Sequence, residues 1–299
     1  MMLDPLSLTP VDAHTPPQEE VPLDRSPAPD EETPGFGHAV LFFALSVPLL
    51  FVGESLSLFL VKLVPAFHRQ NYRALFKLMS SDARFAIPMQ AFVYLLIGLV
   101  TVAVFTVLWQ RPFSEGIHWN AAIARRRISW LFMLGIGLGV GITFLQAYLP
   151  IPMPQNPPIL EDMVHSSLGA WMMLFFGISL APLMEELAFR GFLLSGLIHA
   201  FRWLMRNQVL SAEAFSWMTV PLSVLLTTIP FALLHAEQVS RAWGPLMLIG
   251  LVSVALCVVR LRLRSVAAST IVHAAYNFTL FAGLLLQTEG FRHLERLNS

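Results

Sequence analysis

The sequence predicts an all-α membrane protein with seven or eight transmembrane helices around a polar intramembrane cavity. Hydrophobic residues make up 56% of the chain and charged residues only 13%, whereas soluble proteins carry roughly 25% charged residues. The apolar residues gather in runs of about 20, the length that a helix needs to cross the hydrocarbon core of a bilayer. We therefore expect an integral, multi-pass protein surrounded by lipid, and we place it in a bacterial plasma membrane.

Two parts of the chain differ in composition. Residues 1–36 are rich in Pro, Asp and Glu and nearly lack aromatic residues, which favours a disordered acidic tail because such a segment buries too little apolar surface to offset the entropy of ordering. Residues 37–299 are expected to form one helical membrane domain. The formal net charge of zero gives no indication of a nucleic-acid partner. The single cysteine, Cys257, excludes an internal disulfide and a zinc site built from cysteines.

The hydropathy pattern predicts seven long spans. The run 191–205 either continues the fourth span or forms a short eighth one, because Pro182 and Gly191 permit a bend there. The third span has glycine at every second position from Gly135 to Gly141, and these overlapping GxxxG spacings favour close packing against another helix. The expected spans are 39–63, 85–109, 129–149, 168–190, 217–236, 243–260 and 266–287.

Two adjacent carboxylates close the fourth span, where hydrocarbon is expected. A charged group inside a membrane costs at least a few kcal/mol, so it marks a functional site by default. Glu186 and Arg190 are four residues apart, which places them on one face of a helix as an ion pair. Glu185 points about 100° away from that face. We therefore expect Glu186 and Arg190 to be structural, and Glu185 to be available for chemistry.

Two further polar clusters lie in later spans. Phe231-Ala-Leu-Leu-His235 closes the fifth span, and His273-Ala-Ala-Tyr-Asn277 lies inside the last, with His273 and Asn277 one helical turn apart on the same face. A carboxylate can take a proton from water, histidine exchanges protons near neutral pH, and asparagine can donate to an oxyanion. Each residue alone is commonly structural, but their joint occurrence indicates a hydrolytic site inside the membrane.

Other intramembrane protease chemistries do not fit the sequence. No His-Glu-x-x-His motif occurs, so the usual zinc-binding helix is missing. No aspartate falls inside an expected span, which excludes an aspartyl pair. Ser195 is not part of a rhomboid motif, because Leu193 occupies the position where that motif has glycine.

The ordered motifs resemble those of a known family. EELAFRG from Glu185, FALLH ending at His235 and HAAYN from His273 are similar to the EExxxR, FxxxH and HxxxN motifs of the CAAX prenyl protease and bacteriocin-processing family (CPBP, or Abi). The similarity covers about residues 168–287. It implies an intramembrane endopeptidase that cuts a membrane-associated peptide or protein, with CAAX-type processing near the carboxyl terminus as one known activity.

The resemblance also implies roles for the motif residues. Glu185 would activate the attacking water, and Glu186 with Arg190 would shape the site. His235 and His273 would be catalytic or contact a metal, and Asn277 would help to hold the oxyanion. The family leaves open whether a metal takes part. Glu185, His235 and His273 together would suit a divalent ion such as zinc with one position open for water.

The position of His235 does not fit a simple seven-span arrangement, and two other functions also fit the sequence. With seven spans, His235 falls at the far end of the fifth span from Glu185 and His273, and we expect a bent fifth span, broken around Pro221 and Pro230, to bring it back. A non-catalytic bacteriocin-immunity or peptide-binding membrane protein would keep the same polar cavity. A proton-coupled transporter would also place Glu and His in spans.

Overall fold

The computed structural model describes residues 33–148 and 166–297, and every regular element in those ranges is helical. Within them, seven helical stretches are long and apolar enough to cross a membrane, which confirms the all-α multi-pass architecture. The predicted tail, 1–36, lies outside the described residues except for its last four. The elements are α1 (Phe36–Lys62), α2 (Tyr72–Ser81), α3 (Ala83–Trp109), α4 (Phe113–Gly116), α5 (Ala121–Arg126), α6 (Ile128–Tyr148), α8 (Ser167–Ile178), α9 (Leu180–Glu186), the π-helix η2 (Leu187–Leu193), α10 (Leu194–Arg206), α11 (Ala212–Leu234), the 3₁₀ turn η3 (Glu237–Val239), α12 (Trp243–Leu263), α13 (Val266–Gln287) and the 3₁₀ turn η4 (Leu294–Leu297).

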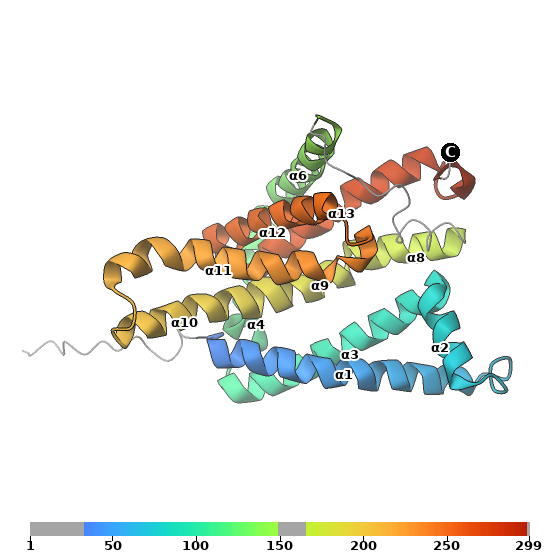
Figure 1. Cartoon of the computed structure of the whole chain (residues 1–299), viewed down its shortest axis with the longest axis horizontal. Coiled ribbons are helices and arrows are strands. Elements are labelled where there is room, and N and C mark those ends of the chain that lie inside the picture. The colour runs from blue at the N-terminus through green and yellow to red at the C-terminus, as the bar shows by residue number, and fades with distance from the viewer. Residues whose placement is uncertain (1–32, 149–165, 298–299) are drawn as a thin grey trace, which may run out of the picture.

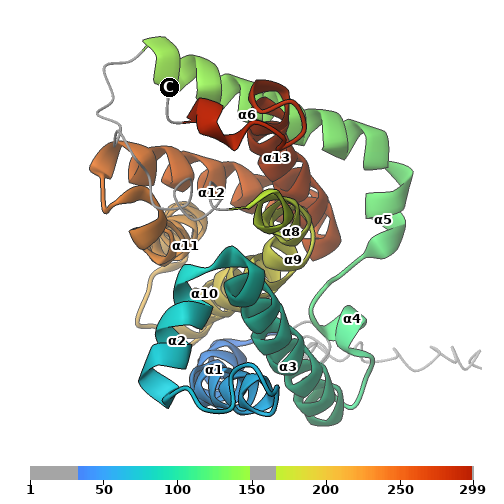
Figure 2. The same cartoon turned by 90° about the vertical axis from the view of Figure 1, so that its right-hand side faces the viewer.

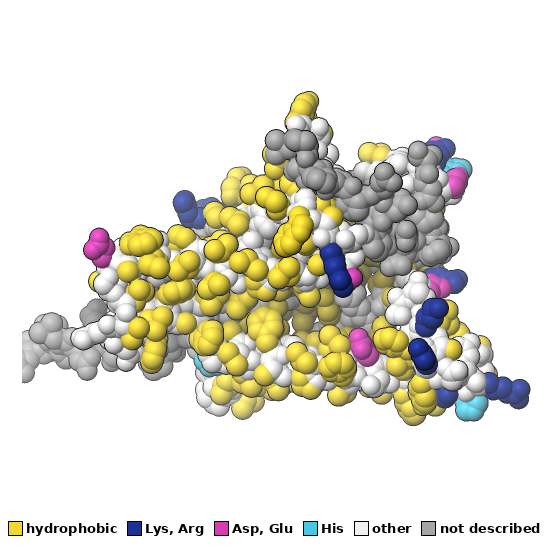
Figure 3. Space-filling model, in the orientation of Figure 1, with side chains coloured by type: hydrophobic (Ala, Val, Ile, Leu, Met, Phe, Trp, Pro, Cys, Tyr) yellow, Lys and Arg dark blue, Asp and Glu magenta, His cyan; other side chains and the backbone are white. Residues whose placement is uncertain are grey.

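Helices α1, α8 and α11 run roughly along the longest axis of the molecule (Figure 1), whereas α6 and α12 cross it, as the view turned by 90° shows (Figure 2). In the end-on view α8 and α9 lie in the middle, with α1 and α3 on one side and α11, α12 and α13 on the other, while α6 lies at the outer edge (Figure 2). Hydrophobic side chains cover much of the face seen in Figure 3. Large apolar residues such as Leu99 and Met247 point outward, which is favourable in a bilayer because lipid tails are as apolar as leucine.

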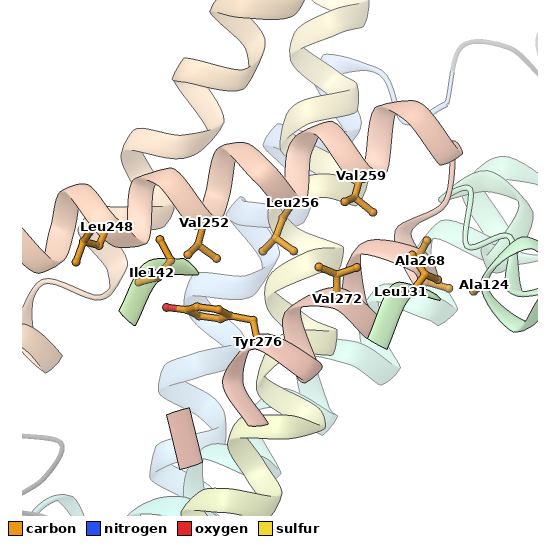
Figure 4. Close-up of a cluster of buried hydrophobic side chains, with 11 residues drawn as sticks. Ala124, Leu131, Ile142, Leu248, Val252, Leu256, Val259, Ala268, Val272 and Tyr276 are labelled. Carbon is orange, nitrogen blue, oxygen red and sulfur yellow. The ribbon is translucent and has the colours of Figure 1, made fainter. Parts of the chain in front are cut away.

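Helices α12 and α13 pack through rows of side chains spaced four residues apart. Leu248, Val252 and Leu256 on α12 face Val272 and Tyr276 on α13, and α6 covers this cluster (Figure 4). A spacing of four places successive side chains on one side of a helix, where they form a ridge that fits between the side chains of the neighbour. This packing holds α13, the helix that carries His273, against the rest of the bundle.

Glycine permits the close approach of α6 to α13. A Cβ atom at Gly135 would lie 2.4 Å from the carbonyl oxygen of Val272, and one at Gly139 would lie 2.7 Å from Cβ of Thr279. Gly137, by contrast, has nothing within 4 Å of its Cβ position. The predicted packing role is therefore confirmed for Gly135 and Gly139, on one face of α6.

The fourth span is a helical path of 40 residues, Ser167–Arg206, about 60 Å long at 1.5 Å per residue. It is interrupted at Ser179, whose φ of −127° and ψ of −85° are not helical, and Pro182 has no N–H to donate to the preceding turn. Beyond Glu186 it widens into η2 and continues through α10. The run 191–205 therefore continues the fourth span, and the eighth span is not formed. Glu185 and Glu186 lie near the middle of the path.

The predicted break in the fifth span is wrong. Pro221 and Pro230 lie inside α11, which is one uninterrupted helix from Ala212 to Leu234. Helices η2 and α10 extend the chain about 30 Å beyond Glu186. Helix α11 begins near the end of α10 and runs back beside it (Figure 1). Its 23 residues cover a similar length, about 35 Å. The long fourth helix, and not a broken fifth one, brings the end of α11 back to the middle of the membrane domain.

Candidate active site

Glu186 and Arg190 form an ion pair that is closed off from the surroundings. Both side chains are completely buried, and Nη1 of Arg190 lies 2.9 Å from Oε1 of Glu186. Nη2 of Arg190 donates to the carbonyl oxygen of Ser253 at 3.1 Å and to its Oγ at 2.9 Å. The guanidinium carbon also lies 4.3 Å from the ring centre of Phe231. The ion pair expected from the spacing of four is therefore present. The contacts of Arg190 with Phe231 and Ser253 connect the fourth span to α11 and α12.

Glu186 also fixes the orientation of His273. Nδ1 of His273 lies 3.0 Å from Oε1 of Glu186, 87 positions away in the sequence. Because Arg190 keeps this carboxylate charged, Oε1 accepts and Nδ1 of His273 carries the hydrogen. In the neutral imidazole, Nε2 then bears the lone pair. That nitrogen points toward Glu185 and lies 3.7 Å from its Oε2.

His235 is also oriented so that its Nε2 bears the lone pair, but here a backbone carbonyl and not a carboxylate accepts from Nδ1. It caps the end of α11, where its Nδ1 lies 2.8 Å from the carbonyl oxygen of Phe231. A carbonyl can only accept, so Nδ1 of His235 donates and its Nε2 bears the lone pair. This Nε2 also lies 3.7 Å from Oε2 of Glu185. Two imidazole nitrogens from different helices thus face the same carboxylate oxygen.

Glu185 differs from its neighbour in exposure and partners. Its side chain is 14% exposed, compared with 15% for His235 and 4% for His273. The 3.7 Å separations exceed an ordinary hydrogen bond, so the carboxylate faces both imidazoles without a direct bond to either. Glu186 is bound by Arg190 and His273. Glu185, by contrast, has an oxygen that faces the lone pairs of the two imidazole Nε2 atoms. A small polar molecule that donates hydrogens, such as water, matches these three acceptors.

Asn277 lies one turn beyond His273 on α13 and reaches a different part of the site. Its Nδ2 donates to the carbonyl oxygen of Gly177 at 2.7 Å. Gly177 belongs to the last turn of α8, just before the interruption at Ser179, where carbonyl groups lose their helical partners. Asn277 therefore stabilises the junction between α8 and α9, the helix that carries Glu185.

Residues 167–279 match the family model described as Type II CAAX prenyl endopeptidase Rce1-like. This part of the chain is similar to the Rce1-like family. The match includes all three motifs and confirms the resemblance to the CAAX prenyl proteases, whereas α1 to α6 lie outside it. Neither the curated proteins nor the solved structures contain a match to the chain. The protein is thus an integral multi-pass membrane protein with an intramembrane CAAX-protease-like region.

Phe231 and Ser253, both in the Rce1-like region, contact the site residues in ways that the sequence analysis did not predict. Phe231 accepts the hydrogen from His235, and its ring lies beneath the Arg190 guanidinium. The spacing of four between Phe231 and His235 was a signal, since it places the imidazole beside that carbonyl. Ser253 binds Arg190 from α12, and no pattern in the sequence indicated this contact.

The Rce1-like site offers donors that zinc accepts, but the side chains are not arranged to hold it. Both imidazoles present an Nε2 lone pair and Glu185 presents a carboxylate, a donor set known from zinc sites. Nevertheless, the part of the chain that the structure describes contains no group of three or more His, Cys, Asp or Glu side chains placed to hold a metal ion. In this arrangement the residues do not fit a zinc ion.

Proposed function

We propose that the protein is an intramembrane endopeptidase that hydrolyses a peptide bond near the carboxyl terminus of a membrane-associated, CAAX-type substrate, with Glu185 as the base. The observation that supports this most is the contrast between the two glutamates. Glu186 is fully buried and paired, while Glu185 is partly exposed and faces two imidazole Nε2 atoms at 3.7 Å. The Rce1-like match over residues 167–279 supports the same reaction class.

The tautomers suggest how the attacking water is held. Because both Nε2 atoms accept, a water at this position donates one hydrogen to Glu185 and the other to an imidazole, which turns an oxygen lone pair toward the substrate carbonyl. Glu185 takes the first proton as the O–C bond forms. It then gives that proton to the amide nitrogen as the C–N bond breaks. His273, held by Glu186, and His235, held by Phe231, position the water throughout.

A peptide-release assay tests this function. The full chain in lipid nanodiscs is incubated with a prenylated peptide that ends in Cys and three further residues, and the products are identified by mass spectrometry. We expect release of the intact carboxyl-terminal tripeptide. The same peptide extended by ten residues at its carboxyl terminus serves as the control for end recognition. Failure to release a tripeptide from a panel of prenylated peptides would contradict the CAAX-type assignment.

Metal dependence is a separate prediction. We expect protein treated with a zinc chelator and then washed to keep its peptidase rate, because Glu185 and the two imidazoles do not form a metal-binding arrangement and a carboxylate base needs no metal. Metal content is measured on the same samples by mass spectrometry. Stoichiometric zinc in active, washed protein, lost together with activity in a His273→Ala variant, would overturn this expectation, since metal ligands lose metal and activity together.

A further inference from the structure

Helix α10 carries a basic face that the candidate active site does not use. His199, Arg202 and Arg206 follow one another at spacings of three and four residues, which places them along one side of the helix. They belong to none of the three motifs that identify the peptidase region. Their charge therefore needs an explanation other than the proposed hydrolysis.

A cavity of about 320 Å³ lies between this basic face and the start of α1. The two helices meet beside it, because a Cβ atom at Gly196 would lie 3.3 Å from the carbonyl oxygen of Gly35. None of the described residues that line the cavity is acidic, so its lining is positively charged. The lining residues are Gly35, Phe36 and Gly37 from the start of α1, and His199, Ala200, Arg202, Trp203 and Arg206 from α10.

The guanidinium of Arg202 lines this cavity without a protein acceptor. Its side chain is partly buried, and no residue in the ranges that the structure describes forms a hydrogen bond or an ion pair with it. A guanidinium carries a permanent charge and five N–H donors. Partial burial of such a group is costly unless an acceptor binds it. Arg202 therefore indicates an anion that enters the cavity.

The start of α1 adds backbone donors to the same cavity. The first N–H groups of a helix have no acceptor within the helix, and the dipole of a helix of 27 residues such as α1 favours an anion at this end. A Cβ atom at Gly37 would have nothing within 4 Å, so the backbone is open to the cavity there. A guanidinium and helix N–H groups together form a donor set that suits phosphate oxygens.

The cavity also lies at the boundary of the membrane domain. Helix α1 begins at Phe36 and α10 ends at Arg206, and the end of α10 and the start of α11 lie at the same end of the molecule (Figure 1). Trp203, which lines the cavity, is 61% exposed, and Trp217 near the start of α11 is 65% exposed. Exposed tryptophans are enriched where lipid headgroups meet water. Lipid phosphates are the anions that are concentrated at this depth.

We propose that this cavity binds the phosphate of an anionic membrane lipid, with Arg202 and the first N–H groups of α1 as donors. A phosphodiester has two unesterified oxygens, which match the parallel N–H groups of a guanidinium. A zwitterionic lipid also carries an ammonium group, and no acidic residue among the described lining residues is present to bind it. The site therefore prefers a lipid without that ammonium group, such as phosphatidylglycerol. The bound lipid links α1 to α10, and the assignment does not depend on the proposed peptidase function.

Arg202→Gln tests the lipid site. The full chain in mild detergent is titrated with phosphatidylglycerol or phosphatidylcholine, and bound lipid is measured by native mass spectrometry on the monodisperse fraction. We expect the wild-type protein to bind phosphatidylglycerol more tightly than phosphatidylcholine. Arg202→Gln should raise the Kd for phosphatidylglycerol by about tenfold or more, the usual effect of losing a charged hydrogen-bond donor. Equal values of this Kd in wild-type protein and in folded Arg202→Gln would overturn the proposal.

Arg262→Gln is the matched control. It removes the same charge from an exposed position in the last turn of α12, and Arg262 does not line the cavity. This variant is expected to keep the wild-type Kd for phosphatidylglycerol. Equal weakening by Arg262→Gln and Arg202→Gln would show that the lipid responds to net charge and not to this cavity, which would also overturn the site.

Two further arms of the experiment identify the anion. Inorganic phosphate at the same concentration is expected to give no thermal stabilisation, and stabilisation equal to that by phosphatidylglycerol would replace the lipid by a free anion. Asp30, Glu31 and Glu32 directly precede Thr33 in the chain, so their carboxylates are competing anions. A variant with Asp30→Asn, Glu31→Gln and Glu32→Gln is expected to keep the wild-type Kd for phosphatidylglycerol. A lower Kd in this variant would show that the tail carboxylates occupy the site, and would overturn the lipid assignment.

Discussion

Replacement of Glu185 by glutamine is expected to lower kcat for tripeptide release by about 10²–10⁴-fold, the contribution that a positioned general base makes. Glutamine has the same shape, but its amide cannot take a proton from water. The folded yield should not change, because the Glu185 carboxylate faces the two imidazoles at 3.7 Å without a direct hydrogen bond to either. Steady-state kinetics and size-exclusion chromatography on the same preparation measure both quantities.

Glu186→Gln is the matched control, because the two glutamates are adjacent on one helix. Glu186 is completely buried between Arg190 and His273, so its substitution should lower the folded yield first.

A substrate-binding measurement distinguishes a peptidase from a non-catalytic peptide-binding protein. The Glu185→Gln protein should still bind the prenylated peptide while cleavage is lost. Undiminished cleavage by Glu185→Gln would remove the general-base role.

Helical spacing explains which parts of the site were predictable from the sequence. The pairing of Glu186 with Arg190 follows from a separation of four residues, and the same rule places Glu185 on another face. Both features are present in the structure. The span boundaries followed from apolar run length, because a bilayer requires about 20 such residues for each crossing. These are local properties, determined by residues within one or two turns of each other.

The parts that could not be predicted depend on distant segments. The position of His235 depends on how far the fourth helix continues, and the sequence from Gly191 to Met205 fits both a continuation and a separate span. Proline suggested a break in α11, yet a membrane helix tolerates proline when neighbouring groups satisfy the backbone. The bond between Glu186 and His273 joins residues 87 positions apart. No periodicity within either helix encodes that contact.

The second large effect is expected in folding. Arg190→Ala should destabilise the protein by about 3–5 kcal/mol, the usual cost of removing one partner from a buried ion pair. The substitution leaves Glu186 charged in the interior and removes the hydrogen bonds to Ser253. Thermal unfolding in a mild detergent and the yield of monodisperse protein measure the loss.

The surface pair Glu237 and Arg241 provides a matched control with the same spacing of four. Its side chains are 78% and 75% exposed, and exposed pairs typically contribute about 0.2–1 kcal/mol. Arg241→Ala should therefore have little effect on thermal unfolding. Equal, small effects of Arg190→Ala and Arg241→Ala would show that the buried pair is dispensable for folding.

A double substitution separates the folding role of the buried pair from its role in orienting His273. Replacing Glu186 by glutamine and Arg190 by methionine removes both charges and keeps similar volumes, so neither variant residue leaves the unpaired buried charge that makes the loss of one partner costly. We expect the double variant to recover most of the stability lost in Arg190→Ala. Peptidase activity should stay low, because a glutamine amide can donate as well as accept and therefore no longer fixes the hydrogen on Nδ1 of His273 as the acceptor-only carboxylate does. Recovery of stability and activity together would show that the ion pair contributes to folding alone, and that His273 needs no carboxylate to orient its ring.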